Sequence, residues 1–186
     1  MGNTSQEKPD HQEDELIANI ADGDQLAFNR LVQKHGPKLH NLALRFTGSA
    51  ADADEIAQET LFRLWQSADK WQPGKARLST WLFRITTNLC IDLARKKKRH
   101  MEISSADPPE LIDDQPDTST ILQSRQELQF IEEQISQLPE KQKMTLLLST
   151  QQGKSNKEIA EVLNLSEGAV EQLLVRARRS LRQAYR

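Results

Sequence analysis

The sequence predicts an all-α protein of two small helical domains joined by a flexible acidic linker. Apolar residues recur at helical spacing before residue 100 and again after residue 125, and no segment shows the alternation of a strand. Between them, residues 101–124 contain six Asp or Glu, three prolines and no Lys or Arg, which is typical of an extended linker. We therefore expect a disordered tail over 1–12, a first domain over 13–100, the linker over 101–124 and a second domain over 125–186.

The net charge of −2 conceals two basic parts. Residues 13–100 contain 14 Lys or Arg against 11 Asp or Glu, and residues 154–186 contain 7 against 4. Because clustered cations attract phosphates, two basic domains on an acidic tether indicate two surfaces for nucleic acid.

The composition argues against several other classes. No run of about 18 apolar residues occurs, so no membrane span is expected, and residues 1–12 lack the apolar core of a secretory signal. The single cysteine, Cys90, cannot form an internal disulfide, which indicates a reducing cytoplasm, and we expect its thiol to be buried rather than to act as a redox switch. The histidines are scattered and no phosphate-binding glycine loop is present, so neither a metal nor another cofactor is expected.

The first domain begins with short helices. An apolar stripe of Leu16, Ile17 and Ile20 predicts a helix that ends at Gly23, and Asp24 is expected to cap the next one. Gly36-Pro37 is expected to interrupt that helix before the period resumes over residues 39–46. A third helix is predicted over residues 53–67 and a loop over residues 72–74.

A long basic helix closes the first domain. Ser79 or Thr80 is expected to cap it, and it should run to about residue 99 with Leu82, Ile85, Leu89 and Leu93 buried. The opposite side carries arginines around one asparagine, a pattern suited to a nucleic-acid groove: Arg84, Asn88, Arg95 and Arg99. The alternative is that the basic end only complements the helix dipole and aids solubility. In the preceding loop, Lys75 and Arg77 lie between two tryptophans; Trp81 is expected in the core, while Trp71 could be buried or could stack on bases.

The second domain ends in a predicted helix-turn-helix. A helix over residues 121–138 and another starting at Leu138-Pro139-Glu140 precede it. Ser155 and Glu158 form a capping-box sequence, and Ser166 caps the last helix after a turn at residues 164–166. That helix buries Val170, Leu173, Leu174, Ala177 and Leu181. Its other face can offer hydrogen bonds to base edges through Glu171, Gln172, Val175, Arg176 and Arg179. The alternative is an ordinary amphipathic hairpin with a solvated basic face.

One apolar residue falls on a polar helix face. Phe62 is predicted to lie among Glu55, Gln58, Glu59 and Gln66 rather than with the buried residues of its helix. An aromatic ring in that setting is typical of a protein-docking surface, unless another helix of the same domain covers it.

The order and spacing of these motifs resemble the extracytoplasmic-function (ECF) group of the bacterial sigma-70 family over residues 13–186. The resemblance lies in Gly23-Asp24 with Ala27-Phe28; Asp54-Glu55 with Gln58-Glu59 and Phe62; Trp81-Leu82-Phe83-Arg84-Ile85 with Asn88, Asp92 and Arg95; Leu138-Pro139; and Glu158-Ile159-Ala160 with Arg176-Ala177-Arg178 and Leu181.

This resemblance implies a role for each surface. The first domain would be sigma region two, binding the β′ coiled coil of core RNA polymerase through Asp54, Glu55, Gln58, Glu59 and Phe62. Its loop and long helix would hold and help melt the minus-ten element, with Asn88 near a pocket for a flipped-out base; this minus-ten set is Lys75, Arg77, Arg84, Asn88, Arg95, Lys98 and Arg99. The second domain would be region four, touching the polymerase β flap and reading the minus-thirty-five element through Glu171, Gln172, Val175, Arg176 and Arg179. The acidic linker would thread the channel that RNA later occupies.

The resemblance also implies a stress-response factor held by an anti-sigma factor, with no catalytic chemistry of its own. Each domain carries only a small positive excess, so we expect weak DNA binding by the chain alone. One departure is Glu171-Gln172, where many relatives have basic or small polar residues, and it predicts an unusual minus-thirty-five preference. A stand-alone helix-turn-helix regulator and an enzyme remain alternatives, although residues 13–100 show neither receiver strands nor a ligand-cleft motif.

Overall fold

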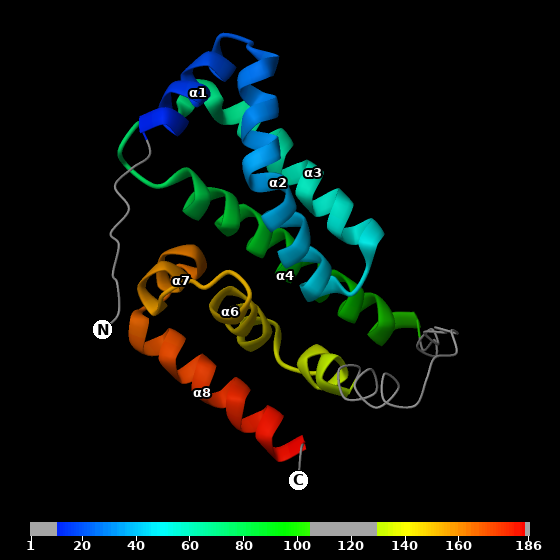
Figure 1. Ribbon diagram of the computed structural model, residues 1–186. Coiled ribbons are helices and arrows are strands. Elements are labelled where there is room, and N and C mark those ends of the chain that lie inside the picture. Colours follow the sequence, from blue (N-terminus) through cyan, green and yellow to red (C-terminus); the bar gives the residue numbers. More distant parts are fainter. Residues whose placement is uncertain (1–10, 105–129, 185–186) are drawn as a thin grey trace, which may run out of the picture.

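The computed structural model describes residues 11–104 and 130–184, which form helices joined by short turns and loops (Figure 1). The first domain contains α1 (His11–Ala21), α2 (Gln25–Thr47), α3 (Ala50–Ser67), the short 3-10 helix η1 (Ala68–Lys70) and α4 (Leu78–Ser104). After a helical segment over residues 130–136, the second domain contains α6 (Glu140–Thr150), α7 (Asn156–Leu163) and α8 (Glu167–Ala184). The described residues include no strand, which agrees with the predicted all-α class.

Local side-chain chemistry sets the helix boundaries in the first domain. The Asp24 carboxylate accepts hydrogen bonds from the backbone N–H groups of Leu26 and Ala27 and so caps α2, as predicted. Gly48 ends α2 at a φ of 71°, a left-handed conformation that glycine adopts without steric cost, and Ser49 then caps α3.

The predicted break at Gly36-Pro37 is wrong, since α2 continues through both residues. Proline lacks the N–H that would bond to the carbonyl of Gln33. Gln33 and Pro37 are both exposed, so water can bind that carbonyl instead. The buried face continues on both sides of the proline, with Leu31 before it and Leu39 after it, and its packing holds the helix together.

Several predicted boundaries also move. Helix α1 includes His11 and Gln12, which had been assigned to the tail, and α3 starts at Ala50 rather than near residue 53. Helix α4 begins at Leu78 and runs to Ser104, because no proline or glycine interrupts the chain before Pro108. The first residues of the predicted linker are therefore helical. The rest of the linker, the remainder of the tail and the start of the helix predicted over residues 121–138 lie outside the described residues.

The two domains share one continuous core. Leu31, Leu42 and Leu82 are fully buried among α1–α4, and Met144, Leu148, Ile159 and Val170 are fully buried among α6–α8. These two groups belong to the same apolar cluster. Figure 1 shows α4 between the α2–α3 pair on one side and α6 and α7 on the other. The domains are thus packed against each other, which the sequence did not predict.

Two features are absent from the part of the chain that the structure describes. None of the helices within residues 11–104 and 130–184 is long and apolar enough to cross a membrane. The same residues contain no group of three or more His, Cys, Asp or Glu side chains arranged to hold a metal ion.

Candidate nucleic-acid interface

A tight helix-turn-helix presents α8. The Ser155 hydroxyl accepts from the Glu158 N–H at 3.3 Å and the Glu158 carboxylate accepts from the Ser155 N–H at 2.9 Å, which is the predicted capping box of α7. Burial would raise the pKa of Glu158, but hydrogen bonds from Ser155 and the nearby cations Lys154 and Arg77 hold it below its usual range. Asn164 turns the chain at a φ of 52°, and Ser166 caps α8 by accepting from the Ala169 N–H at 3.2 Å.

The outer face of α8 is fully accessible. Val170, Leu174 and Ala177 are buried beneath it, with Leu173 and Leu181 half-buried. All five side chains of the predicted minus-thirty-five set are exposed, and Val175 has 64% of its surface accessible. Glu171, Gln172, Val175 and Arg176 line one shallow hollow together with Gly168. The structure therefore brings this predicted set together on one face.

Helix α4 has a different buried surface from the one predicted. Leu82 is buried, but Ile85, Leu89 and Leu93 are only half-buried. A second stripe, Phe83, Thr87, Cys90 and Ile91, is buried instead because α6 and α7 cover it. The intervals of four, three and one residues between these positions match a second buried side of a helix, and this pattern could have predicted it. Burial raises the pKa of the Cys90 thiol to about 12, which agrees with its prediction as an unreactive buried residue.

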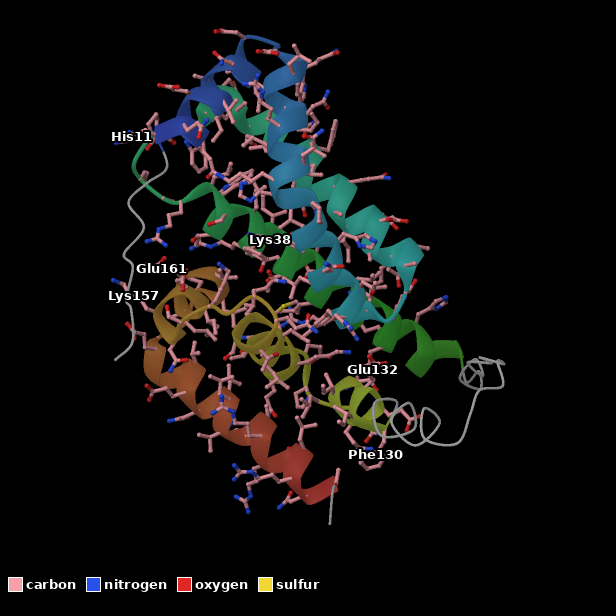
Figure 2. The ribbon with its side chains drawn as sticks, in the orientation of Figure 1. His11, Lys38, Phe130, Glu132, Lys157 and Glu161 are labelled. Carbon is pink, nitrogen blue, oxygen red and sulfur yellow. The ribbon has the colours of Figure 1, made fainter. Side chains whose placement is uncertain are left out.

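Part of the predicted minus-ten set lies at the border of the second domain, where Arg84, Asn88 and Arg95 remain exposed. Arg84 Nη2 donates to the backbone oxygen of Glu161 in α7 at 2.6 Å; Figure 2 labels Glu161. Asn88 and Arg95 line a cavity whose other wall includes Lys141, Leu163 and Leu165. Arg77 lies 3.7 Å from Glu158.

The other members of this set lie elsewhere. Lys75, in the loop before α4, donates to Gln72 Oε1 at 3.1 Å. Lys98 and Arg99 are exposed near the far end of α4. Six of the seven minus-ten residues are thus exposed, and Arg77 is half-buried. Arg84, Asn88, Arg95 and Arg99 share one side of α4 at helical spacing, while Lys75 and Arg77 lie in the loop before it.

The loop before α4 is held by α1. The indole N–H of Trp71 donates to Asp14 Oδ1 at 2.7 Å, and the Trp71 ring meets Trp81 edge-on, with 6.0 Å between ring centroids. Both rings are half-buried. Trp71 is thus anchored in this structure, and the loop that carries Lys75 and Arg77 starts from a fixed point.

A buried carboxylate joins α1 to α2. Glu13 Oε1 lies 2.6 Å from His35 Nε2 and 2.9 Å from Lys34 Nζ, and Glu13 and His35 are both buried. Burial would raise the pKa of Glu13, but the hydrogen bonds from His35 and Lys34 outweigh it and hold the pKa below its usual range. No sequence pattern predicts this cluster, because Lys34 and His35 lie 21 and 22 residues after Glu13 and no motif connects them.

Phe62 lies on an open surface of α3, with 53% of its side chain exposed. No other helix among the described residues covers it, so the alternative of an internal contact is wrong for this part of the chain. Asp54, Glu55 and Gln58 are exposed around it. Glu59 accepts from Arg63 at 2.7 Å, and Asp54 lies 3.1 Å from His40. The five predicted polymerase-binding residues therefore share one accessible helix face.

Comparison with known proteins places these features in one family. Residues 31–100 match the family model of sigma-70 region 2, and residues 129–181 match that of sigma-70 region 4. The RNA polymerase sigma factor NccH of Alcaligenes xylosoxydans xylosoxydans is 35% identical, over 90% of this chain and 92% of its own length. The ECF sigma factor SigW of Bacillus subtilis is 31% identical, over 91% and 95%. The chain spans 64% of the longer SigE of Mycolicibacterium smegmatis, at 31% identity.

Solved structures show the same architecture. CnrH in complex with the cytosolic domain of CnrY superposes with a TM-score of 0.68 at 29% identity, covering 92% of this chain and 96% of that one. The sigma factor RpoE in complex with the anti-sigma factor NepR, from Bartonella quintana, has a TM-score of 0.66 at 22% identity, covering 85% and 96%, which is a likeness of fold alone.

A two-domain helical protein with a helix-turn-helix and these matches is a transcription initiation factor, not an enzyme. The chain belongs to the sigma-70 family, in its ECF group. As a sigma factor it serves core RNA polymerase in promoter-specific initiation.

Proposed function

We propose that the two domains divide the reading of the promoter, and that α8 reads the minus-thirty-five element as duplex DNA. The observation that carries this proposal is the exposed face of α8, which presents two arginines, a glutamate, a glutamine and a valine. The opposite face of the helix is buried against the domain. A helix of this kind fits the major groove, where Arg can bond guanine, Glu can accept from the cytosine amino group and Val can meet the thymine methyl.

Helix α4 and the loop before it take the minus-ten element in this proposal. Asn88 has a polar, uncharged side chain suited to the edge of an unpaired base. Arg84 and Arg95 flank it at helical spacing, and Lys75, Arg77, Lys98 and Arg99 extend the positive charge along the strand to bind its phosphates.

The Phe62 surface of α3 is the proposed docking site for the β′ coiled coil of core polymerase. An exposed aromatic ring among carboxylates and an amide offers an apolar anchor with a polar rim. The second domain would contact the β flap. CnrH was solved in complex with the cytosolic domain of CnrY, which supports a protein partner of this kind, an anti-sigma factor, for this chain and a cytoplasmic location.

In vitro transcription with purified core polymerase on a promoter library tests this division. Arg176→Ala should reduce initiation about tenfold or more, since a good bidentate base contact contributes roughly 1–3 kcal/mol. Asn88→Ala should lower open-complex formation while leaving duplex binding at the minus-thirty-five element unchanged.

Arg30→Ala and Asn41→Ala are the matched controls, because both residues are exposed on α2 outside the proposed surfaces. Unchanged initiation after Arg176→Ala and Asn88→Ala together would overturn the proposal.

A further inference from the structure

A polar cavity lies between the two domains, and we call it the interdomain cavity. Residues of α1 and α2 line one side of it, the start of α4 and the loop before it line another, and the loop between α6 and α7 lines the third together with the start of α7. Its volume is about 820 Å³, which is within the range of small-molecule sites. Figure 2 labels His11 and Lys38, which both line it from the first domain.

The lining of the interdomain cavity has an excess of positive charge. Four Lys or Arg side chains and two Glu side chains line it, so the excess is two (four minus two) when the histidines are neutral. The cations are Lys34, Lys38, Arg77 and Lys154, and the carboxylates are Glu13 and Glu158. Because these cations come from both domains, the positive charge surrounds the cavity rather than lying along one helix.

Both carboxylates of the cavity already have partners. Glu13 Oε1 lies 2.6 Å from His35 Nε2 and 2.9 Å from Lys34 Nζ. Glu158 accepts from the backbone N–H and from the hydroxyl of Ser155, each at 2.9 Å, and lies 3.7 Å from Arg77. Glu13 and Glu158 thus balance one cation each, and the other two cations of the cavity are not compensated.

These two cations are Lys38 and Lys154. Lys38 is exposed on α2, and no hydrogen bond or ion pair joins it to another side chain among the described residues. Lys154 is half-buried, with its Nζ 4.5 Å from the Phe83 ring centre. Burial lowers the pKa of Lys154, and repulsion from Arg77 and Lys38 lowers it further, against the attraction of nearby carboxylates. An anion placed among these three cations would reduce their repulsion.

The size and charge of the cavity suit a ligand with several phosphate groups. Lys and Arg both bind phosphate, Lys as a compact charge and Arg as a planar fork of donors. A single phosphate ion would fill only a small part of the cavity, whereas a chain of two or three phosphates can reach cations on several of its sides. Ser79 and Gln152 also line the cavity and add uncharged groups that can donate hydrogen bonds to phosphate oxygens.

We propose that the interdomain cavity binds a small oligophosphate, either an inorganic chain or the triphosphate group of a nucleotide, through Lys38, Arg77 and Lys154. Such a ligand would connect α2 and the loop before α4 to the loop before α7, and so join the two domains. The site includes no residue of the α8 reading face or of the Phe62 surface, and it shares only Arg77 with the minus-ten set. The proposal therefore does not depend on the proposed function.

Isothermal titration calorimetry of the full-length chain tests this proposal, with sodium tripolyphosphate and with ATP as separate ligands. Each should bind at one site per chain. Sodium phosphate at the same ionic strength should bind at least about tenfold more weakly, because it contacts fewer cations. Tighter binding of ATP than of tripolyphosphate would identify a nucleotide as the ligand, and equal or weaker binding would identify an inorganic chain. Either ligand should also raise the melting temperature as its concentration rises, since it binds the folded chain.

Three variants that each remove one positive charge locate the site. Lys38→Gln and Lys154→Gln should each weaken tripolyphosphate binding roughly tenfold, as expected when a charged hydrogen bond is lost. Lys157→Gln is the matched control, because Lys157, which Figure 2 labels, is exposed on α7 outside the cavity. Its affinity should stay within about twofold of the wild type, since distant exposed charges are screened. Circular dichroism checks the fold of each variant. Lys38 is exposed, so Lys38→Gln tests the site even if Lys154→Gln is unstable.

Three results would each overturn the proposal. The first is that neither tripolyphosphate nor ATP binds more tightly than sodium phosphate. The second is that Lys157→Gln weakens binding as much as Lys38→Gln, which would show attraction by overall charge alone. The third is that a short single-stranded oligonucleotide binds more tightly than tripolyphosphate and loses the same affinity in Lys38→Gln, which would make the cavity part of the DNA surface. None of these results changes the expected effects of Arg176→Ala and Asn88→Ala on initiation.

Discussion

At the scale of single residues, the Glu13 carboxylate is a buried polar group of α1. It joins α1 to α2 through His35 and Lys34, and the neighbouring Asp14 holds the Trp71 indole. Glu13 thus joins α1 to α2, and its neighbour Asp14 holds the start of the loop that precedes α4. Neither has a role in DNA chemistry, so their effects can be measured as stability and order.

The lowered pKa of Glu13 predicts a pH dependence of folding. A carboxylate whose folded pKa lies below its ordinary 4.5 stabilises the fold above that pH, and this stabilisation is lost as the pH falls through the folded pKa. Glu13→Gln should therefore lower the free energy of unfolding at pH 7 by about 1–3 kcal/mol, and this difference from wild type should shrink as the pH falls through the folded pKa of Glu13. Urea unfolding at several pH values measures this. Glu15→Gln, an exposed neighbour on α1, should show no such difference.

The Asp14–Trp71 hydrogen bond predicts local order in the minus-ten loop. Asp14→Ala leaves the buried part of the Trp71 indole without its acceptor, so residues 72–77 should open more often. Trypsin cleavage after Lys75 and Arg77 should become several-fold faster than in wild type, with little change elsewhere. Asp22→Ala, just after α1, is the control; an equal rise there would show that α1 as a whole, rather than this bond, orders the loop.

At the scale of elements, the faces of α8 and α3 carry opposite chemistry for different partners. Helix α8 shows arginines and a carboxylate around one exposed valine, as a base-reading helix needs. Helix α3 shows carboxylates and an amide around one exposed phenylalanine, which would repel DNA phosphates and favours a protein partner. Substitutions on α8 should therefore change promoter preference, and substitutions on α3 should change the affinity for core polymerase.

Glu171 should set part of the minus-thirty-five preference. A carboxylate on the reading face would repel phosphate and can be accommodated only against a donor such as the cytosine amino group. Glu171→Arg should shift the preferred base at one position of the minus-thirty-five element, measured by transcription from a randomised promoter library. Glu167→Arg, exposed in the first turn of α8 outside the reading set, should leave the preference unchanged. If neither variant changed the preferred base, Glu171 would not contact a base of the minus-thirty-five element.

Phe62 should contribute to the affinity for core polymerase and not to the stability of the fold. Truncating an exposed aromatic anchor of an interface commonly costs 2 kcal/mol or more of binding, so Phe62→Ala should weaken the affinity for core polymerase roughly thirtyfold. Because the ring is 53% exposed, the urea midpoint should change little. Leu26→Ala removes an even more exposed apolar side chain from α2, and polymerase binding should tolerate it.

At the scale of the whole molecule, the continuous core makes the two domains one folding unit in the free state. All three tryptophans, Trp65, Trp71 and Trp81, lie in the first domain, whereas helices in both domains contribute to circular dichroism. Wild-type urea transitions followed by tryptophan fluorescence and by circular dichroism should therefore coincide. Lys143→Glu reverses the charge that lies 5.3 Å from the Phe46 ring centre between the domains, so it should weaken their packing and separate the two curves. Separate curves in the wild type would show that the contact between the domains contributes too little stability to make them unfold together.

The sequence alone determined the helical class, the caps at Asp24, Ser155 and Ser166, and the composition of the α8 and α3 faces, because these depend on spacing within one helix and on local hydrogen bonds. It misjudged Pro37, where burial on both sides kept a helix intact that local propensity would end. The domain boundaries and the roles of the site residues remain predictions.

Tertiary structure decided everything that depends on residues far apart in the chain. The Glu13–His35 contact, the anchoring of Trp71 by Asp14 and the burial of Phe83, Thr87, Cys90 and Ile91 under the second domain each join segments that no motif connects. A helix has two sides that can be apolar, and only packing determines which neighbour covers each. On α4, packing buries one side under the second domain, while Arg84, Asn88 and Arg95 stay exposed beside it. The arrangement of the two domains, rather than either helix alone, therefore determines what surrounds the minus-ten residues.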